Sequence, residues 1–140
     1  MYTLGDLPRK GALLFPDNEA VVFEDQRFTF EQLNIRVNRI GNALIDLGYQ
    51  KGDRITVLSD NCSQYVEIYY AAAKTGISVT PINTRLSDDE IVHIVNDCEA
   101  TCFFVGDGYE SRVFKLIPRC ERIKSCISFQ SDQHGYVNYD

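Results

Sequence analysis

A short polar loop, predicted for residues 81–86, contains the side chains that are most suited to binding a ligand. Its sequence is PINTRL, and it follows the apolar run Ile77–Thr80, which is typical of a buried strand. In an open α/β sheet, ligands bind beyond the carboxyl ends of the strands, which is where this loop would lie. Arg85 is the only cation in the loop. A guanidinium is chemically suited to a phosphate, which it can bind through two hydrogen bonds.

Arg85 also allows a structural interpretation. Asp88 and Asp89 follow it closely, and an arginine beside the first turn of a helix often forms an exposed ion pair with such carboxylates. In that case Arg85 would fix the start of the helix and would have no ligand. The residues alone leave both alternatives open.

No complete catalytic motif occurs in the sequence. The patterns GxSxG, GxGxxG, GxxxxGKS/T and HExxH are all absent. The turn Gly106–Gly108 has two glycines whose backbone amides suit an anion, but Asp107 between them would repel a phosphate. We therefore expect an ordinary turn there, and no catalytic residue in this segment.

The five cysteines do not form a pattern that is typical of a metal site. The spacings from Cys98 to Cys102 and from Cys120 to Cys126 differ from those of common zinc modules, and neither histidine lies at ligand spacing from them. We expect no metal site, and we expect reduced, mostly buried thiols of the kind found in cytosolic proteins.

Two capping boxes predict where helices begin. Thr29 is followed after three residues by Gln32, and Ser87 is followed after three residues by Glu90. After Thr29, an apolar stripe with spacings of three and four residues leads to Gly48, which would end the helix. The stripe consists of Leu33, Val37, Ile40, Leu44 and Leu47. We interpret this stripe as core packing.

A pattern with a period of 24 residues predicts the fold. Residues 53–76, 77–100 and 101–124 each open with an apolar, largely β-branched run and continue into a helical stretch. The apolar runs, including a fourth that follows, are Ile55–Leu58, Ile77–Thr80, Cys102–Val105 and Ile123–Phe129. Such strands, alternating with helices, are typical of a parallel sheet with right-handed crossovers. We predict a three-layer α/β fold, with a largely parallel sheet and helices on both faces; a repeat solenoid is the alternative.

The remaining elements are predicted as follows. Two strand-like runs, Glu19–Phe23 and Arg27–Phe30, indicate a small antiparallel hairpin at one edge. Residues 1–18 contain two prolines and are expected to form an irregular arm before a subdomain of residues 19–140. Pro81 should end its strand, because proline cannot donate a hydrogen bond to the ladder.

Composition and charge exclude several classes of function. The 140 residues are 44% apolar and 24% charged, as in an ordinary globular domain. Residues 86–111 contain seven acidic and no basic side chains, which would repel nucleic acid phosphates and disfavours nucleic acid as a partner. No apolar run reaches the roughly 18 residues of a membrane span, and the N-terminus lacks the pattern of a signal peptide. We therefore expect a cytoplasmic protein.

Several segments resemble motifs of the adenylate-forming (AMP-binding) enzymes, which include acyl-CoA synthetases, luciferases and the adenylation domains of peptide synthetases. The segment FTFEQL at Phe28–Leu33 is similar to the LTYxEL motif of that family, and KGDRI at Lys51–Ile55 is similar to its pGDrV motif. Asn61 with Tyr65–Glu67 resembles the helix that follows in the family. Together with the segment described next, these matches extend from Glu19 to Phe129 in the family's order.

The segment AKTG at Ala73–Gly76, followed by PINTRL, resembles the KaGa...PlNpRL segment of the family. Asn83 and Arg85 are more similar to acyl-CoA synthetases than to peptide-synthetase domains, in which aspartate is usual at the asparagine position. The resemblance is therefore strongest to an acyl-CoA synthetase.

This resemblance implies a function for the parent protein. Such an enzyme uses ATP and Mg²⁺ to convert a carboxylic acid into an acyl-adenylate and then transfers the acyl group to coenzyme A. The position of Arg85 resembles that of the PlNpRL arginine, so the resemblance implies that Arg85 reaches a phosphate of coenzyme A. It does not define the chain length of the acid.

The resemblance also implies that the phosphate-binding loop, the substrate pocket and the catalytic lysine come later in the enzyme than residues 1–140. Residues 19–140 would then be an N-terminal subdomain, truncated before the phosphate loop. We expect such a fragment to be inactive and to bind none of these cofactors. The competing hypothesis is a stand-alone module for binding or assembly, and a homodimer is one form that it could take.

Overall fold

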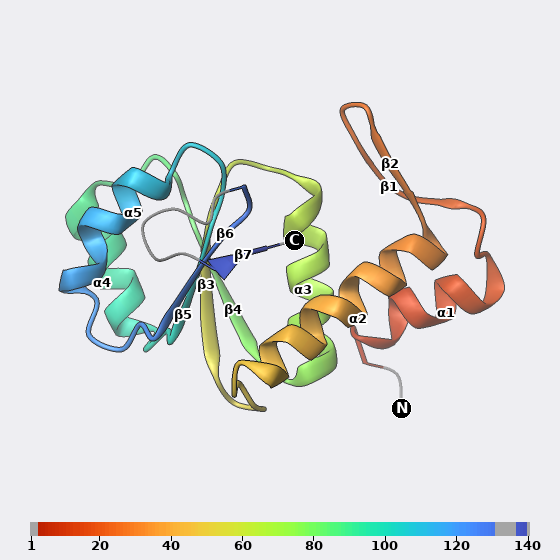
Figure 1. Ribbon diagram of the computed structural model, residues 1–140, viewed down its shortest axis with the longest axis horizontal. Coiled ribbons are helices and arrows are strands. Elements are labelled where there is room, and N and C mark those ends of the chain that lie inside the picture. Colours follow the sequence, from red (N-terminus) through yellow and green to blue (C-terminus); the bar gives the residue numbers. More distant parts are fainter. Residues whose placement is uncertain (1–2, 131–136, 140) are drawn as a thin grey trace. The chain divides into compact units, whose positions relative to one another are not determined.

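The computed structural model describes residues 3–130 and 137–139, which form two compact units (Figure 1). The first unit contains residues up to 52 together with residues 61–77. The second contains residues 53–60 and the chain from residue 78 onward. The loop of residues 81–86 identified in the sequence belongs to the second unit.

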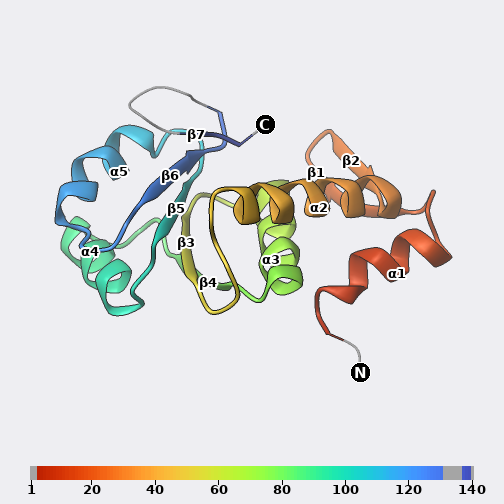
Figure 2. The same cartoon turned by 60° about the horizontal axis from the view of Figure 1, so that its bottom comes forward.

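The first unit consists of three helices and a hairpin (Figure 2). Its elements are α1 (Asp6–Leu14), β1 (Glu19–Phe23), β2 (Gln26–Thr29), α2 (Phe30–Asp46) and α3 (Ser63–Thr75). Strands β1 and β2 pair in antiparallel orientation and form a two-stranded sheet of their own. Helix α2 packs against both α1 and α3. The predicted hairpin is therefore present.

Helix α1 contradicts the expectation that residues 1–18 form an irregular arm. Pro8 lies in the first turn, where the backbone N–H groups have no intrahelical acceptor, so this proline costs no hydrogen bond. Gly11 lies against the ring of Phe30, and a Cβ at this position would overlap that ring. The helix is thus stabilised by a close contact with the start of α2, which the local sequence does not reveal.

The predicted start of α2 is confirmed. The hydroxyl of Thr29 accepts the Gln32 N–H at 3.2 Å, and the Gln32 side chain accepts the Thr29 N–H at 2.9 Å. The first four members of the apolar stripe are buried, but Leu47 is 45% exposed. Gly48 turns the chain with φ of +90°, and Tyr49 is buried after it. The prediction for Leu47 was therefore wrong.

A buried carboxylate links α3 to α2 and to the hairpin. Glu67 is 1% exposed and forms an ion pair with Arg36, whose two guanidinium nitrogens donate to the two carboxylate oxygens. The Arg36 guanidinium also lies over the ring of Phe28, 4.9 Å from its centroid. A buried charge is tolerated only when it is paired in this way.

No helix within residues 3–130 and 137–139 is long and apolar enough to cross a membrane. Helix α2, the longest of them, has 17 residues and several charged side chains.

The second unit is built on a parallel sheet. Its strands are β3 (Arg54–Leu58), β4 (Ser78–Ile82), β5 (Cys102–Val105), β6 (Ser125–Ser128) and β7 (Val137–Asn138). Its helices are α4 (Asp88–Asp97) and α5 (Glu110–Leu116), with a short 3-10 helix, η1 (Ile117–Arg119). The strand order is β4-β3-β5-β6-β7, and every neighbouring pair is parallel. The predicted α/β class with a largely parallel sheet is confirmed.

Helices α4 and α5 cover one face of this sheet (Figures 1 and 2). Ile91 and Val95 of α4, with Val113 of α5, are fully or almost fully buried in one cluster with side chains of the strands. The strand side chains of the cluster include Phe103 and Val105. Apolar burial of this kind is the main source of stability in such a layer.

Pro81 lies within β4 and pairs in register with Val57, so the prediction that it ends the strand was wrong. The reason is the position of β4 at the edge of the sheet. An edge strand has one side without a partner strand, and proline is tolerated there because no ladder donor is required.

The chain changes direction across the sheet after β4. It passes from β3 to β4 on one side and then crosses to β5 on the other side of β3. At the adjacent carboxyl ends of β3 and β5, Gly106 donates its N–H to the Leu58 carbonyl at 2.9 Å and lies directly against Ser59. A Cβ on Gly106 would overlap the Ser59 side chain and come within 2.9 Å of its Cα. Gly106 is therefore required by the close approach of two backbones.

The five cysteines are thiols and not disulfides in the part of the chain that the structure describes. Cys102 and Cys120 are buried, whereas the other three are half-buried, so fewer thiols are buried than the sequence led us to expect. Burial, together with the neighbouring Cys120, raises the pKa of the Cys126 thiol to about 11. Since the thiolate is the reactive form, Cys126 is unreactive at neutral pH.

The first prediction compares the cap of α2 with its core stripe. Thr29→Ala is expected to lower the free energy of unfolding by about 1 kcal/mol, because it removes the N-cap hydrogen bond. Leu44→Ala is expected to cost more, roughly 2–5 kcal/mol, because it leaves a cavity in the core. Chemical denaturation measures both values. Leu47→Ala is the control, because Leu47 is 45% exposed. Equal or reversed losses of stability in Thr29→Ala and Leu44→Ala would contradict the placement of the helix.

The second prediction concerns the contact between Gly106 and Ser59. Gly106→Ala is expected to destabilise the chain by about 1–3 kcal/mol, because the new methyl group must displace backbone. Gly41→Ala in α2 is the matched control, since a Cβ there would lie 3.5 Å from Thr75 in an ordinary contact. That variant should be neutral or stabilising. Thermal denaturation of the two variants decides the point, and equal stability would show that the two strand ends need no glycine.

Candidate functional site

The loop between β4 and α4, residues 83–86, is fixed locally by Asn83. The Asn83 side-chain oxygen accepts the Arg85 N–H at 2.9 Å, and the Asn83 carbonyl accepts the Leu86 N–H at 3.2 Å. An asparagine that bonds the backbone two residues later is a common turn-forming element. The loop begins where β4 ends, at the edge where ligands bind in parallel sheets.

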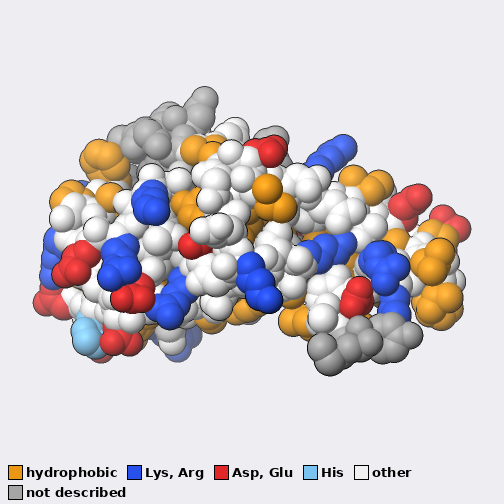
Figure 3. All heavy atoms as spheres, turned by 90° about the horizontal axis from the view of Figure 1, so that it is seen from below, with side chains coloured by type: hydrophobic (Ala, Val, Ile, Leu, Met, Phe, Trp, Pro, Cys, Tyr) orange, Lys and Arg blue, Asp and Glu red, His pale blue; other side chains and the backbone are white. Residues whose placement is uncertain are grey.

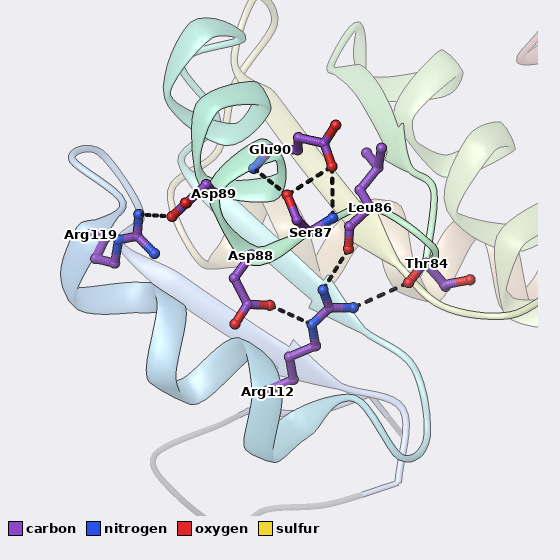
Figure 4. A network of polar contacts seen from close by, with 8 residues as sticks. All are labelled: Thr84, Leu86, Ser87, Asp88, Asp89, Glu90, Arg112 and Arg119. Carbon is purple, nitrogen blue, oxygen red and sulfur yellow. Dashed lines mark hydrogen bonds and ion pairs between the residues drawn. The ribbon is translucent and has the colours of Figure 1, made fainter.

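The second capping box holds the other end of this β4–α4 loop. The Ser87 N–H donates to the Glu90 carboxylate at 2.8 Å, and the Ser87 hydroxyl accepts the Glu90 N–H at 3.4 Å (Figure 4). Hydrogen bonds from the Ser87 backbone and hydroxyl lower the pKa of the Glu90 carboxyl below its usual value. The half of the capping box that the Glu90 carboxylate forms is therefore strongest at neutral pH and weakens when Glu90 is protonated in acid. The predicted helix start is confirmed.

The side chain of Arg112, which lies on helix α5, contacts the β4–α4 loop (Figure 4). Its guanidinium donates to the Thr84 carbonyl at 3.1 Å and to the Leu86 carbonyl at 2.6 Å. Its Nε donates to the Asp88 carboxylate at 2.7 Å. Three acceptors on the loop and on the first turn of α4 are thus bound by one side chain.

The structure does not form the ion pair between Arg85 and Asp88 or Asp89 that the sequence allowed. Asp88 pairs with Arg112, and Asp89 pairs with Arg119 at 2.6 Å. The start of α4 is therefore held by arginines from α5 and η1. Among the residues that the structure describes, Arg85 is exposed and makes no ion pair.

The other arginines of the second unit are paired with acids. Glu99 binds both Arg54, at 2.6 Å, and Arg122, at 3.2 Å. The space-filling view shows basic and acidic side chains beside one another on the face it presents (Figure 3). An anion would compete with these carboxylates for a paired arginine, whereas Arg85 has no such competitor among the described residues.

The chemistry that this arrangement supports is anion binding. An exposed guanidinium, on a loop that is held at both ends, suits a phosphate group. The turn at Gly106 is explained by backbone packing, since Gly106 meets Ser59 and Gly108 has a φ of +82°. Within the described residues, no group of three or more His, Cys, Asp and Glu side chains is arranged to bind a metal ion.

Sequence reasoning missed Arg112. The only signal is its position as the first basic residue after the acidic stretch of residues 86–111. Arg112 lies 24 residues from Asp88 along the chain, and only the crossover through β5 brings them together. Pairing over such a distance cannot be inferred from local spacing.

Known proteins similar in sequence identify the family. The family model for AMP-binding enzymes matches residues 9–137. The acyl-CoA ligase sidI of Aspergillus fumigatus is 30% identical over 99% of this chain and 26% of its own length. The fatty acid–[acyl-carrier-protein] ligase ScoC of Streptomyces coeruleorubidus is 36% identical over 72% of this chain and 20% of its own length. The chain thus spans between a fifth and about a quarter of the length of these curated relatives.

Solved structures give the same result. A putative long-chain-fatty-acid CoA ligase from Rhodopseudomonas palustris has a TM-score of 0.94 with this chain and is 30% identical. The match covers 99% of this chain and 35% of that structure. The fold, the motif order and the family model agree, and the chain belongs to the family of AMP-binding enzymes.

Proposed function

We propose that the chain is the N-terminal part of an ATP-dependent acyl-CoA synthetase. In this reaction a carboxylic acid attacks ATP to give an acyl-adenylate and pyrophosphate, and the thiol of coenzyme A then displaces AMP to form a thioester. The family membership and the names of the ligase relatives support this proposal. We further propose that residues 19–140 correspond to an N-terminal subdomain that precedes the phosphate loop.

Within that enzyme, we assign residues 1–140 a supporting role and one direct contact. Adenylate formation depends on a cationic, glycine-rich phosphate cradle, a motif that this sequence does not contain. ATP and Mg²⁺ would therefore be bound by other residues of the enzyme. The direct contact is between Arg85 and a phosphate of coenzyme A. The observation that carries this assignment is that Asp88 and Asp89 are paired with other arginines, which leaves the Arg85 charge available.

The acceptor and the acid are parts of the proposal. One relative is named a ligase for an acyl carrier protein, so thioester formation on a carrier protein is an outcome that the tests must distinguish. We propose a fatty acid as the carboxylic acid, because several relatives are named for fatty acids. We also propose a cytoplasmic location, which the presence of five thiols and no disulfide among the described residues supports.

A non-catalytic binding or assembly module is the second candidate. The observation in its favour is an exposed apolar surface on the first unit, where Leu13, Leu14 and Phe15 are 54–74% exposed at the end of α1. Large exposed apolar side chains in a group are typical of a surface that another polypeptide covers. We call the product of the whole reading frame that contains residues 1–140 the complete protein. Its activity distinguishes the two candidates.

The third prediction is that residues 1–140 alone do not form an acyl-adenylate. ATP–pyrophosphate exchange with a panel of fatty and aromatic acids should stay at background for this chain, because it lacks a phosphate loop. The complete protein should show acid-dependent exchange. Turnover by the isolated chain would contradict the supporting role, and background exchange by the complete protein would favour the non-catalytic module.

The fourth prediction concerns Arg85 in the complete protein. Arg85→Ala should raise the KM for coenzyme A about tenfold, a loss of about 1.4 kcal/mol in binding. ATP–pyrophosphate exchange should stay nearly unchanged, because the adenylate forms before coenzyme A reacts. Arg119→Ala is the matched control, since Arg119 is also an exposed arginine near α4 but is paired with Asp89. An unchanged KM with a lower melting temperature would return Arg85 to a structural role.

A further inference from the structure

We infer that Arg112 is a positioning residue for coenzyme A binding: it holds the β4–α4 loop in the shape that presents Arg85. This inference rests on the proposed function of Arg85. Arg112 itself does not contact the ligand. It acts through the backbone of the loop.

The contacts of Arg112 lie on both sides of Arg85 in the chain. Its guanidinium binds the carbonyl of Thr84, at 3.1 Å, and the carbonyl of Leu86, at 2.6 Å. These are the residues immediately before and after Arg85. The Thr84 carbonyl belongs to the peptide group that precedes Arg85, and the Leu86 carbonyl belongs to the second peptide group after it, so Arg112 holds the backbone on both sides of residue 85 (Figure 4). The peptide group between them is held by Asn83, whose carbonyl accepts the Leu86 N–H. Together these contacts restrict the direction in which residue 85 leaves the backbone.

The charge of Arg112 is neutralised in this arrangement. Its Nε donates to Asp88 at 2.7 Å, and its side chain is only 30% exposed. A phosphate would have to displace Asp88 in order to bind Arg112. Arg85 has no ion pair within the described residues, so the two arginines of this region have separate roles, one for support and one for the ligand.

The local turn cannot replace this contact. Asn83 fixes the start of the loop and the Ser87–Glu90 capping box fixes its end, but neither bonds the carbonyls of Thr84 and Leu86. Without Arg112 these two carbonyls would depend on water, and exposed backbone of this kind opens easily. A loop that is ordered before binding loses less entropy when the ligand arrives, which increases affinity.

The geometry requires an arginine. Three donors of one planar group point to three acceptors, which the single ammonium of lysine cannot reproduce. Arg112→Lys keeps the charge and can still pair with Asp88, so it should recover only part of the function. Arg112→Met keeps much of the length of the side chain and removes every donor.

The experiment uses the complete protein with coenzyme A and measures the KM for coenzyme A and the rate of ATP–pyrophosphate exchange. Arg112→Met should raise the KM about three- to tenfold, within the range for lost hydrogen bonds to a charged group, and leave exchange nearly unchanged. Arg112→Lys should lie between Arg112→Met and the unmodified protein. Arg119→Met, which removes the ion pair with Asp89 but no contact with the loop, should leave the KM unchanged.

A double variant tests whether Arg112 acts through Arg85. If it does, Arg85→Ala combined with Arg112→Met should have the same KM as Arg85→Ala alone, because there is no guanidinium left to position. If the increase in KM in the double variant equals the product of the increases in the two single variants, Arg112 acts independently of Arg85 and the inference is wrong.

A second readout follows the loop directly in residues 1–140. Hydrogen exchange of the Arg85 and Leu86 amides should accelerate about tenfold in Arg112→Met, because opening of the loop becomes easier. Arg119→Met should leave both amides unchanged. Unchanged exchange in Arg112→Met would overturn the inference.

The outcomes separate this inference from the proposed function. If Arg85→Ala raises the KM for coenzyme A and Arg112→Met does not, the inference is wrong and the proposed contact of Arg85 stands. If Arg85→Ala leaves the KM unchanged, or if the complete protein has no activity that depends on coenzyme A, both are wrong.

Discussion

Burial of the central strands β3 and β5 is the constraint on which the second unit depends. Three of the five β3 side chains, and all four of β5, are apolar and almost completely inaccessible to solvent. Thr56, the one buried polar side chain of β3, donates its hydroxyl to the Thr80 carbonyl at 2.9 Å. Within a parallel sheet that is buried in this way, a polar side chain is tolerated only where it is hydrogen-bonded, as Thr56 is. The groups that can bind a ligand are therefore found where the strands end.

The strand ends of this sheet have different roles. At β5, Gly106 permits close packing against Ser59 and contributes no side chain. At β4, the loop of residues 83–86 packs Leu86 against the core, whereas Arg85 is exposed. Four hydrogen-bonding side chains shape this loop and the start of α4: Asn83, Ser87, Glu90 and Arg112.

The distribution of charge explains how one arginine becomes available. The acidic stretch of residues 86–111 has no basic residue of its own, so its carboxylates pair with arginines from elsewhere in the chain. Arg112 and Arg119 neutralise Asp88 and Asp89, and Arg54 and Arg122 share Glu99. Arg85 precedes this stretch and lies on the loop that enters it. Asp88 and Asp89, the carboxylates nearest to Arg85 in sequence, pair with Arg112 and Arg119, and Arg85 makes no ion pair within the described residues.

Features with a local cause could be predicted from the sequence, whereas features with a distant cause could not. Both capping boxes and the alternation of strands with helices follow from residues that are neighbours in the chain. The helix at residues 6–14 depends on the contact of Gly11 with Phe30, and the place of Pro81 within β4 depends on the edge position of that strand. The contacts of Arg112 with the β4–α4 loop depend on the crossover through β5, which brings together residues that are far apart in the sequence. For the candidate site, the sequence therefore identified the residue proposed to face the ligand and missed the residue that supports it.

The most direct test of the role of Arg85 is the affinity of coenzyme A for the complete protein, measured by isothermal titration calorimetry at low and at high salt. An exposed contact between a guanidinium and a phosphate is screened by salt. If Arg85 makes this contact, the unmodified protein should bind more weakly at high salt, whereas Arg85→Ala should bind weakly already at low salt and depend less on salt. Equal affinities and equal salt dependence for the two proteins would contradict the contact.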